Sequence, residues 1–171
     1  MASEESGINE RLFGMSDEKM KGAGWFKILS RPYDGELLPP EDKDFVSEEN
    51  IFNYQAKIIK DLAEKESCVI VGRCADYALE DFDNCISVYV HAPFEDRIKR
   101  IENEYGIPNG KSKEMLMKKD KQRSSYYNYY SSNKWGDAKS YDLCLNSSYL
   151  GIDGSVDPVS YTHLTLPTNS R

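Results

Sequence analysis

The chain has 171 residues and carries 29 acidic against 22 basic side chains, a formal net charge of −7. This length suits one domain, and the acidic balance means that the chain as a whole is not drawn to nucleic acid or to an anionic membrane, so any basic site must be local. No apolar run approaches the ~20 residues of a membrane span, and the N-terminus lacks the cationic and apolar regions of a signal peptide, which together predict a cytoplasmic protein.

The first half of the chain predicts an irregular segment followed by a helix and a strand. Residues 1–46 show weak periodicity and mix Gly and Pro with aromatic residues, which indicates an irregular excursion that could cover a substrate. From Ser47, which suits a helix N-cap, apolar residues recur at helical spacing. Residues 68–71 are apolar and rich in β-branched side chains, so they predict a strand covered on both faces, as in parallel sheets.

The second half repeats this alternation of strands and helices. Residues 85–92 predict a strand, and Pro93 then opens a helix that ends at Gly106. A long basic and aromatic helix is predicted over residues 113–130, and a third strand over residues 141–148. This order predicts an α/β fold with a parallel sheet and helices on both of its faces.

An arginine follows the first predicted strand directly after its closing glycine. Ligands of open α/β sheets bind just beyond the carboxyl ends of the strands, which is where Arg73 lies. Its guanidinium offers two parallel donors that suit a phosphate group. The alternative is an arginine paired with a structural carboxylate, and the residues alone leave both interpretations open.

The long helix carries a second group of charged residues. Lys119, Asp120, Arg123 and Tyr127 recur at three- and four-residue spacings, so one helical face presents two cations, a carboxylate and a phenol, which suits a phosphate. The same pattern also fits a solvated charged face with aromatic residues packed beneath it. Tyrosines beside basic groups can stack nucleic-acid bases as well, but the acidic balance of the chain argues against that role.

The helix after Pro93 carries two further arginines. Arg97 and Arg100 lie three residues apart and could hold a nucleotide, or could form ordinary surface pairs with Glu102 and Glu104. The four cysteines form no Cys-x-x-Cys pair, so no metal site is predicted.

Several blocks of sequence resemble the cytidylate kinase-like proteins, which are nucleoside monophosphate kinases of the P-loop class. The blocks "LAEKESCVIVGRCADYALEDF", "VYVHAPFEDRIKRI" and "KKDKQRSSYYNYYSSNKWGDAKSYDLCLNSS" occur in the order and spacing of that family. The resemblance covers about residues 3–153. It implies that Arg73 binds the phosphate of the acceptor monophosphate and that Asp76 lies beside its sugar or base.

The resemblance also assigns the remaining charged residues to phosphoryl transfer. It implies that Lys119 and Arg123 are the catalytic residues of a lid that closes over the transferring phosphoryl group. Arg97 and Arg100 would help to hold ATP. Where the better-known cytidylate kinases have an Asp after Gly-Arg, this chain has Cys74, which leaves the preferred base open.

The chain departs from the family pattern at both of its ends. The family begins with a strand, a glycine-rich phosphate loop and a helix, and no such loop is found in this sequence. From about Val159 the sequence loses amphipathic periodicity and resembles a translated sequencing adapter. We therefore expect a partial three-layer domain over residues 1–158, lacking the first strand and phosphate loop, and an unstructured tail over residues 159–171.

Two functions follow from this interpretation. The first is phosphoryl transfer from ATP, with Mg²⁺, to CMP or dCMP in a longer parent protein, of which this chain would be an inactive fragment. The alternative is a non-catalytic nucleotide-binding or interaction module that lacks the phosphate loop. In both cases the expected partners are nucleotides, with no nucleic acid, membrane or protein partner.

Overall fold

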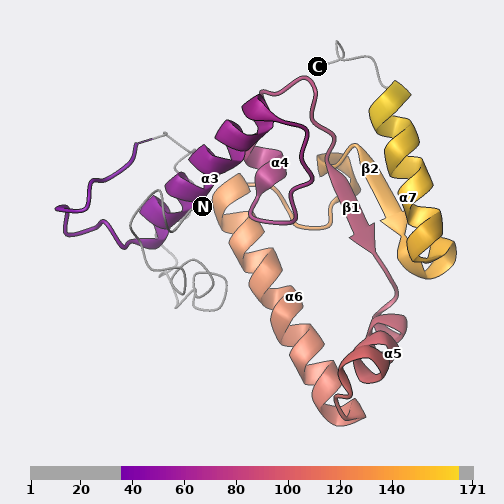
Figure 1. Ribbon diagram of the computed structural model, residues 1–171. Helices are drawn as coiled ribbons and strands as arrows, with labels where there is room; N and C mark the ends of the chain where they lie inside the picture. Colours follow the sequence, from indigo (N-terminus) through magenta and orange to yellow (C-terminus); the bar gives the residue numbers. More distant parts are fainter. Residues whose placement is uncertain (1–35, 166–171) are drawn as a thin grey trace. The chain divides into compact units, whose positions relative to one another are not determined.

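The computed structural model describes residues 36–165, which divide into two units (Figure 1). The first unit combines residues 36–81 with Ser125–Ser132, and the second combines Phe82–Ser124 with residues 133–165. The elements in chain order are α3 (Glu48–Lys65), α4 (Ala75–Ala78), β1 (Val88–His91), α5 (Phe94–Tyr105), α6 (Asn109–Ser131), the 3-10 helix η1 (Ala138–Ser140), β2 (Leu143–Asn146) and α7 (Ser147–Thr165). None of the described helices is both long enough and apolar enough to cross a membrane.

Helix α3 begins where the sequence predicts. The Ser47 hydroxyl accepts a hydrogen bond from the backbone N–H of Asn50 at 3.2 Å, and Glu48 and Glu49 place negative charge in the first turn, where the helix dipole favours it. One face of α3 is buried, and its apolar members are Ile51, Phe52, Ala56, Ile58 and Ile59. This face forms the core of the first unit.

The tyrosine-rich end of α6 packs on that buried face of α3. The ring of Tyr130 stacks on Phe52, with centroids 4.1 Å apart and planes 12° apart. The Tyr126 hydroxyl donates to Gln55 Oε1 at 3.0 Å, and the Tyr130 hydroxyl donates to the Glu48 carbonyl at 3.1 Å. Each of these two buried phenols therefore has a hydrogen-bond acceptor. The aromatic rings add apolar burial, and no hydroxyl of the pair is left without a hydrogen bond.

The segment before α3 is irregular, as predicted for the part that is described. Buried Asn50 accepts from the Leu38 N–H at 2.9 Å and donates to the Phe45 carbonyl at 2.7 Å, so one side chain ties residues 36–46 to α3. The rest of the predicted excursion, residues 1–35, lies outside the described residues.

The prediction that residues 68–71 form a doubly covered strand is wrong. The segment has no regular secondary structure, and Val69 and Val71 are 94% and 88% exposed. An apolar run becomes a buried strand only where neighbouring strands pair with it and other elements cover its faces. Neither of the two strands in the described residues pairs with this segment.

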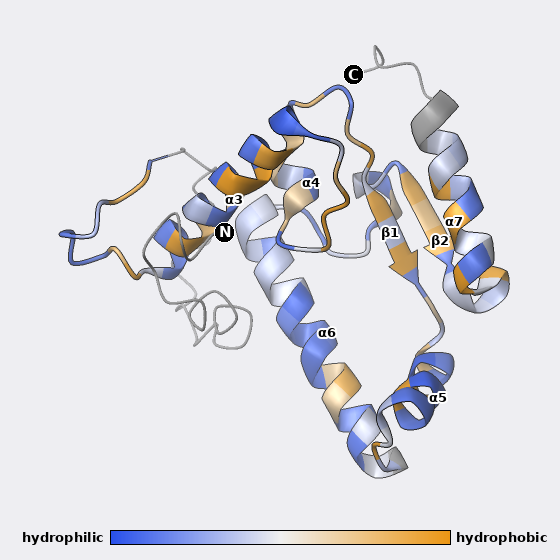
Figure 2. Cartoon of the chain, viewed as in Figure 1, coloured by the Kyte–Doolittle hydropathy of each residue, from blue (hydrophilic) through white to orange (hydrophobic). Residues whose placement is uncertain are grey.

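The other two predicted strands form a parallel pair in the second unit. β1 and β2 run in register from Val88 opposite Leu143 to His91 opposite Asn146. Both strands are coloured as hydrophobic over most of their length in Figure 2. At the start of the ladder the Asp142 carboxylate accepts from both the backbone N–H and the hydroxyl of Ser87, each at 2.8 Å. The α/β class and the parallel pairing are confirmed, with two strands in the described residues.

In the second unit, α5 begins and ends at the residues that the sequence predicts, whereas α6 extends beyond its predicted ends and α7 continues into the predicted tail. α5 begins after Pro93 and ends at Gly106, whose φ of 62° is the left-handed conformation that favours glycine at a helix end. α6 extends slightly beyond the predicted residues 113–130. α7 continues past Val159, where we expected unstructured chain, while residues 166–171 lie outside the described part. The boundary of the kinase-like domain itself stays a prediction.

The exposure of the irregular segment predicts a weak response to substitution. Replacing Val69 and Val71 together by Thr should change the free energy of unfolding by less than about 0.5 kcal/mol, as for ordinary surface sites. Ile59→Ala, in the core face of α3, should cost about 2–5 kcal/mol. Urea unfolding followed by circular dichroism measures both. A loss above about 2 kcal/mol for the valine pair would mean that this segment is buried in solution.

Candidate functional site

A strained turn precedes α4 in the first unit. Gly72, Arg73 and Cys74 all have positive φ, of 76°, 58° and 52°, and the Ala75 N–H closes the turn by donating to the Gly72 carbonyl at 3.1 Å. A left-handed conformation at a residue other than glycine costs on the order of 1–2 kcal/mol, and such strain concentrates at functional sites. The turn places half-buried Arg73 immediately before the helix that carries Asp76.

The Asp76 carboxylate is held by a tyrosine from α6. The Tyr127 hydroxyl donates to Asp76 Oδ2 at 2.6 Å, and Tyr127 is only 6% exposed. A hydrogen bond to an ionised oxygen at this distance is among the stronger kinds in proteins. The first unit therefore presents both residues predicted to bind the acceptor, Arg73 on the turn and Asp76 in the helix that follows it. Sequence spacing gave no sign of the contact with Tyr127, because it joins residues 51 positions apart.

In the second unit, one carboxylate brings two arginines together. Arg97 donates from both terminal nitrogens to Asp120, at 2.8 and 2.6 Å, and Arg123 donates to the same carboxylate at 3.2 Å. The side chains of Arg97 and Asp120 are 28% and 24% exposed. The hydrogen bond to Asp120 raises the pKa of Arg97, against the opposing effect of burial. Arg97, which is predicted to bind ATP, and Arg123, which is predicted to be catalytic, thus donate to the same carboxylate.

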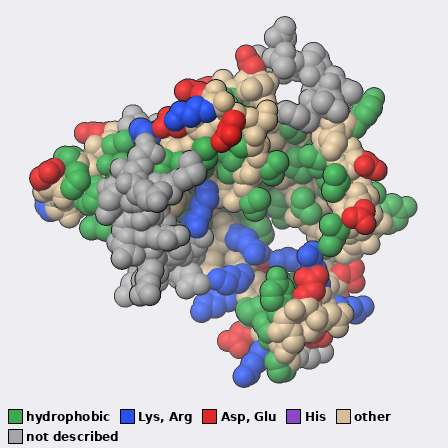
Figure 3. Space-filling view, in the orientation of Figure 1, with side chains coloured by type: hydrophobic (Ala, Val, Ile, Leu, Met, Phe, Trp, Pro, Cys, Tyr) green, Lys and Arg blue, Asp and Glu red, His purple; other side chains and the backbone are tan. Residues whose placement is uncertain are grey.

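This Arg97–Asp120–Arg123 cluster has the composition of an oxyanion site. Two guanidinium groups and one carboxylate leave one excess positive charge, and the paired donors that hold a carboxylate are equally suited to a phosphate. In Figure 3, Lys and Arg side chains also gather in the region of α5 and α6. Chemically, the cluster can exchange its internal carboxylate for an anionic ligand or share the arginines between the two.

An aromatic group of β1 lies within electrostatic range of this cluster. Tyr89 stacks on Tyr141, with centroids 4.9 Å apart, and meets the edge of Trp135 at 5.8 Å. Burial raises the pKa of Tyr89, and the charge of Arg97 opposes that rise. A Cβ at Gly136 would come within 3.0 Å of the Tyr89 hydroxyl, so only glycine fits there without displacing this ring. The sequence pattern does not distinguish Tyr89 as a site residue, because aromatic residues in strands usually pack in the core.

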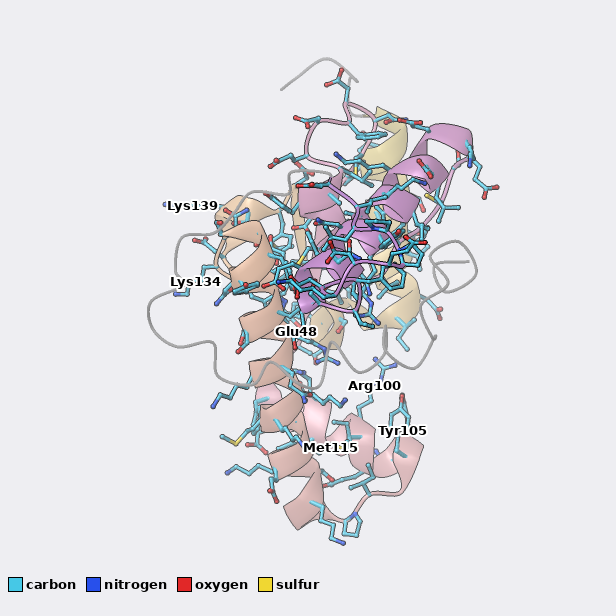
Figure 4. The ribbon with its side chains drawn as sticks, turned by 90° about the vertical axis from the view of Figure 1, so that its left-hand side faces the viewer. Glu48, Arg100, Tyr105, Met115, Lys134 and Lys139 are labelled. Carbon is cyan, nitrogen blue, oxygen red and sulfur yellow. The ribbon has the colours of Figure 1, made fainter. Side chains whose placement is uncertain are left out.

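The two other predicted cations lie on the surface of the second unit. Arg100 donates to Glu104 at 2.9 Å on the exposed side of α5, which is the ordinary surface pairing that the sequence also allowed. Figure 4 shows its side chain extending outward from that helix. Lys119 is exposed on α6, one residue before Asp120. The structure therefore brings Arg97 and Arg123 together but pairs Arg100 elsewhere.

Comparison with known proteins identifies the family. No curated protein matches the chain. Among solved structures, the crystal structure of an uncharacterized protein from Eubacterium ventriosum is similar, with a TM-score of 0.66 and 33% sequence identity, over 72% of this chain and 76% of that chain. The cytidylate kinase-like family matches residues 1–149, which is most of the sequence. The chain therefore belongs to the cytidylate kinase-like family, as its sequence blocks predicted.

Proposed function

We propose that the protein containing this chain transfers a phosphoryl group from ATP to a nucleoside monophosphate, CMP or dCMP. Family membership supports a nucleotide kinase in general. The observation that carries the proposal is the convergence of Arg97 and Arg123 on Asp120, because phosphoryl transfer depends on positioning and on cations that stabilise the developing charge. Direct transfer needs no covalent intermediate on the protein.

The acceptor is proposed to bind at the strained turn of the first unit. The Arg73 guanidinium would contact the phosphate of the monophosphate with two donors, and Asp76 would contact the nucleoside. The left-handed backbone at Arg73 supports this assignment, since a protein retains such strain where the conformation is needed.

The donor nucleotide is proposed to bind at the second unit. Arg97 and Arg123 would engage the phosphates of ATP, with Arg123 acting on the transferring group. Lys119 and Arg100 stay predictions for the same site. In the part of the chain that the structure describes, no three acidic, His or Cys side chains cluster as metal ligands. Mg²⁺ would accompany ATP and would neutralise part of the charge on its phosphates.

The 171 residues by themselves are proposed to bind ATP very weakly. The sequence contains no glycine-rich loop whose backbone amides could surround the phosphates. Titration calorimetry and a phosphoryl-transfer assay on this chain test the point, with CMP as a ligand that should still bind weakly through Arg73. Micromolar affinity for ATP, or measurable turnover, would show that the chain has a complete phosphate site.

Removal of the Arg73 guanidinium should impair use of the acceptor. In the full-length gene product, Arg73→Ala should raise the KM for CMP about tenfold or more and lower kcat, because a charge-assisted contact is lost. Arg73→Lys should restore activity only in part, since an ammonium group cannot reproduce two parallel donors. A coupled kinase assay with CMP, dCMP, UMP and AMP measures this. Lys99→Ala, on the exposed side of α5, is the control for loss of a surface cation.

Wild-type kinetics of Arg73→Ala with every monophosphate would refute the acceptor site. Binding of nucleotides by wild-type protein without turnover would instead favour the non-catalytic module.

Removal of the Arg123 guanidinium should act mainly on the chemical step. Arg123→Ala should lower kcat by about 100-fold or more with a smaller change in the KM for CMP, because its charge would matter most as the phosphoryl group moves. Lys121→Ala, an exposed cation on the same helix, should have little effect. Steady-state kinetics and thermal unfolding of both variants are compared. A change in stability alone, with kcat intact, would mean that this face of α6 is merely a solvated charged surface.

A further inference from the structure

The hydrogen bond from Tyr127 to Asp76 is supported by an ordered set of neighbours. Tyr127 lies in the end of α6 that packs on α3, between Tyr126 and Tyr130, whose hydroxyls donate to Gln55 and to the Glu48 carbonyl. The hydroxyl of Ser131 donates to the Tyr127 carbonyl at 2.6 Å, within the same helix. Tyr127 is therefore a buried side chain on a helix end that is fixed by contacts of its neighbours.

Asp76, in contrast, stands on a short element. α4 has four residues and follows three left-handed residues; Ala75 and Ala78 are its buried members, and Asp76, which lies between them in sequence, is half-buried. Among the described residues, the Tyr127 hydroxyl is the side-chain hydrogen-bond partner of the Asp76 carboxylate. This contact selects one orientation of the carboxylate and uses Oδ2, so Oδ1 stays available as an acceptor.

We propose that Tyr127 is a positioning residue that holds Asp76 to select the nucleoside of the acceptor. An ionised carboxylate only accepts hydrogen bonds, so Oδ1 selects a donor. In CMP, the donors are the exocyclic amine of cytosine and the sugar hydroxyls. Uracil presents a carbonyl acceptor where cytosine has its amine, and its own donor is the ring N3–H, at a different position. This inference rests on the proposed function, because it names the group of the acceptor that the same site recognises.

The test compares two tyrosines that each lose one hydrogen bond. Tyr127→Phe removes the donor to Asp76, at 2.6 Å, and Tyr126→Phe removes the neighbouring donor of α6, which bonds to Gln55 at 3.0 Å. The kcat/KM values of the full-length gene product are measured with CMP, UMP and dCMP. If Asp76 contacts the base, Tyr127→Phe lowers the preference for CMP over UMP by up to about tenfold; if it contacts the 2′-hydroxyl of the sugar, the preference for CMP over dCMP falls instead.

The positioning role has a signature of its own. In an Asp76→Ala background, which has no side-chain acceptor, Tyr127→Phe should cause no further loss of discrimination, because it acts through that carboxylate. Tyr126→Phe should leave both preferences unchanged while lowering thermal stability. Equal losses with all three nucleotides in Tyr127→Phe, or additive losses in the double variant, would overturn the inference and leave Tyr127 a structural residue.

Failure of the proposed function is recognised separately. If the wild-type protein phosphorylates none of the monophosphates, the kinase proposal fails, and the same ratios are then taken from calorimetric dissociation constants for CMP, UMP and dCMP. A CMP preference that Tyr127→Phe abolishes would support the positioning role even then. Absence of binding to every monophosphate would overturn both proposals.

Discussion

The stacking of Tyr130 on Phe52 is the contact on which the first unit depends. It joins the end of α6 to the buried face of α3 across 78 positions of sequence, with ring centroids 4.1 Å apart. Large aromatic side chains bury more apolar area than other residues, and stacked pairs add a further ~0.5–1.5 kcal/mol. The Tyr130 phenol donates to the α3 backbone, and burial raises its pKa further above the neutral range. The helix that carries Tyr127 is thereby held in place.

In the second unit, the negative charge of Asp120 offsets the positive charges of two arginines. Two guanidinium groups repel each other, and Asp120 offsets that repulsion by accepting hydrogen bonds from both Arg97 and Arg123. Because Arg97 and Asp120 are about three-quarters buried, their pairing is screened less than an exposed ion pair would be. The carboxylate thus keeps the two arginines close in the absence of a ligand, where a bare pair would separate.

In each unit a hydrogen bond to a carboxylate fixes the orientation of charged side chains. In the first, a neutral phenol orients a carboxylate, which leaves the negative charge available to a ligand's donors. In the second, a carboxylate orients two cations, which leaves a net positive charge available to a ligand's phosphates. Within its own unit, the Asp76 pairing would suit a hydrogen-bond donor and the Asp120 pairing would suit an anionic group.

Local sequence signals account for the helix ends and for two of the three predicted strands. Ser47, Pro93 and Gly106 act on their own neighbours, through a capping side chain, a fixed φ and a tolerated left-handed φ, so each can be identified without the rest of the fold. The strand predicted over residues 68–71 is wrong, because an apolar, β-branched run does not show whether a partner strand is present.

For the candidate site, too, the sequence identified residues and the structure identified their contacts. The sequence by itself determined the family, through blocks of residues in a fixed order, and it identified Arg73, Asp76, Arg97 and Arg123 as candidates. Only the tertiary structure decided their partners, because Tyr127 reaches Asp76 over 51 positions and Arg97 reaches Asp120 over 23. Such pairings depend on which helix faces are buried together, and a hydrogen bond forms only when packing brings donor and acceptor to about 3 Å.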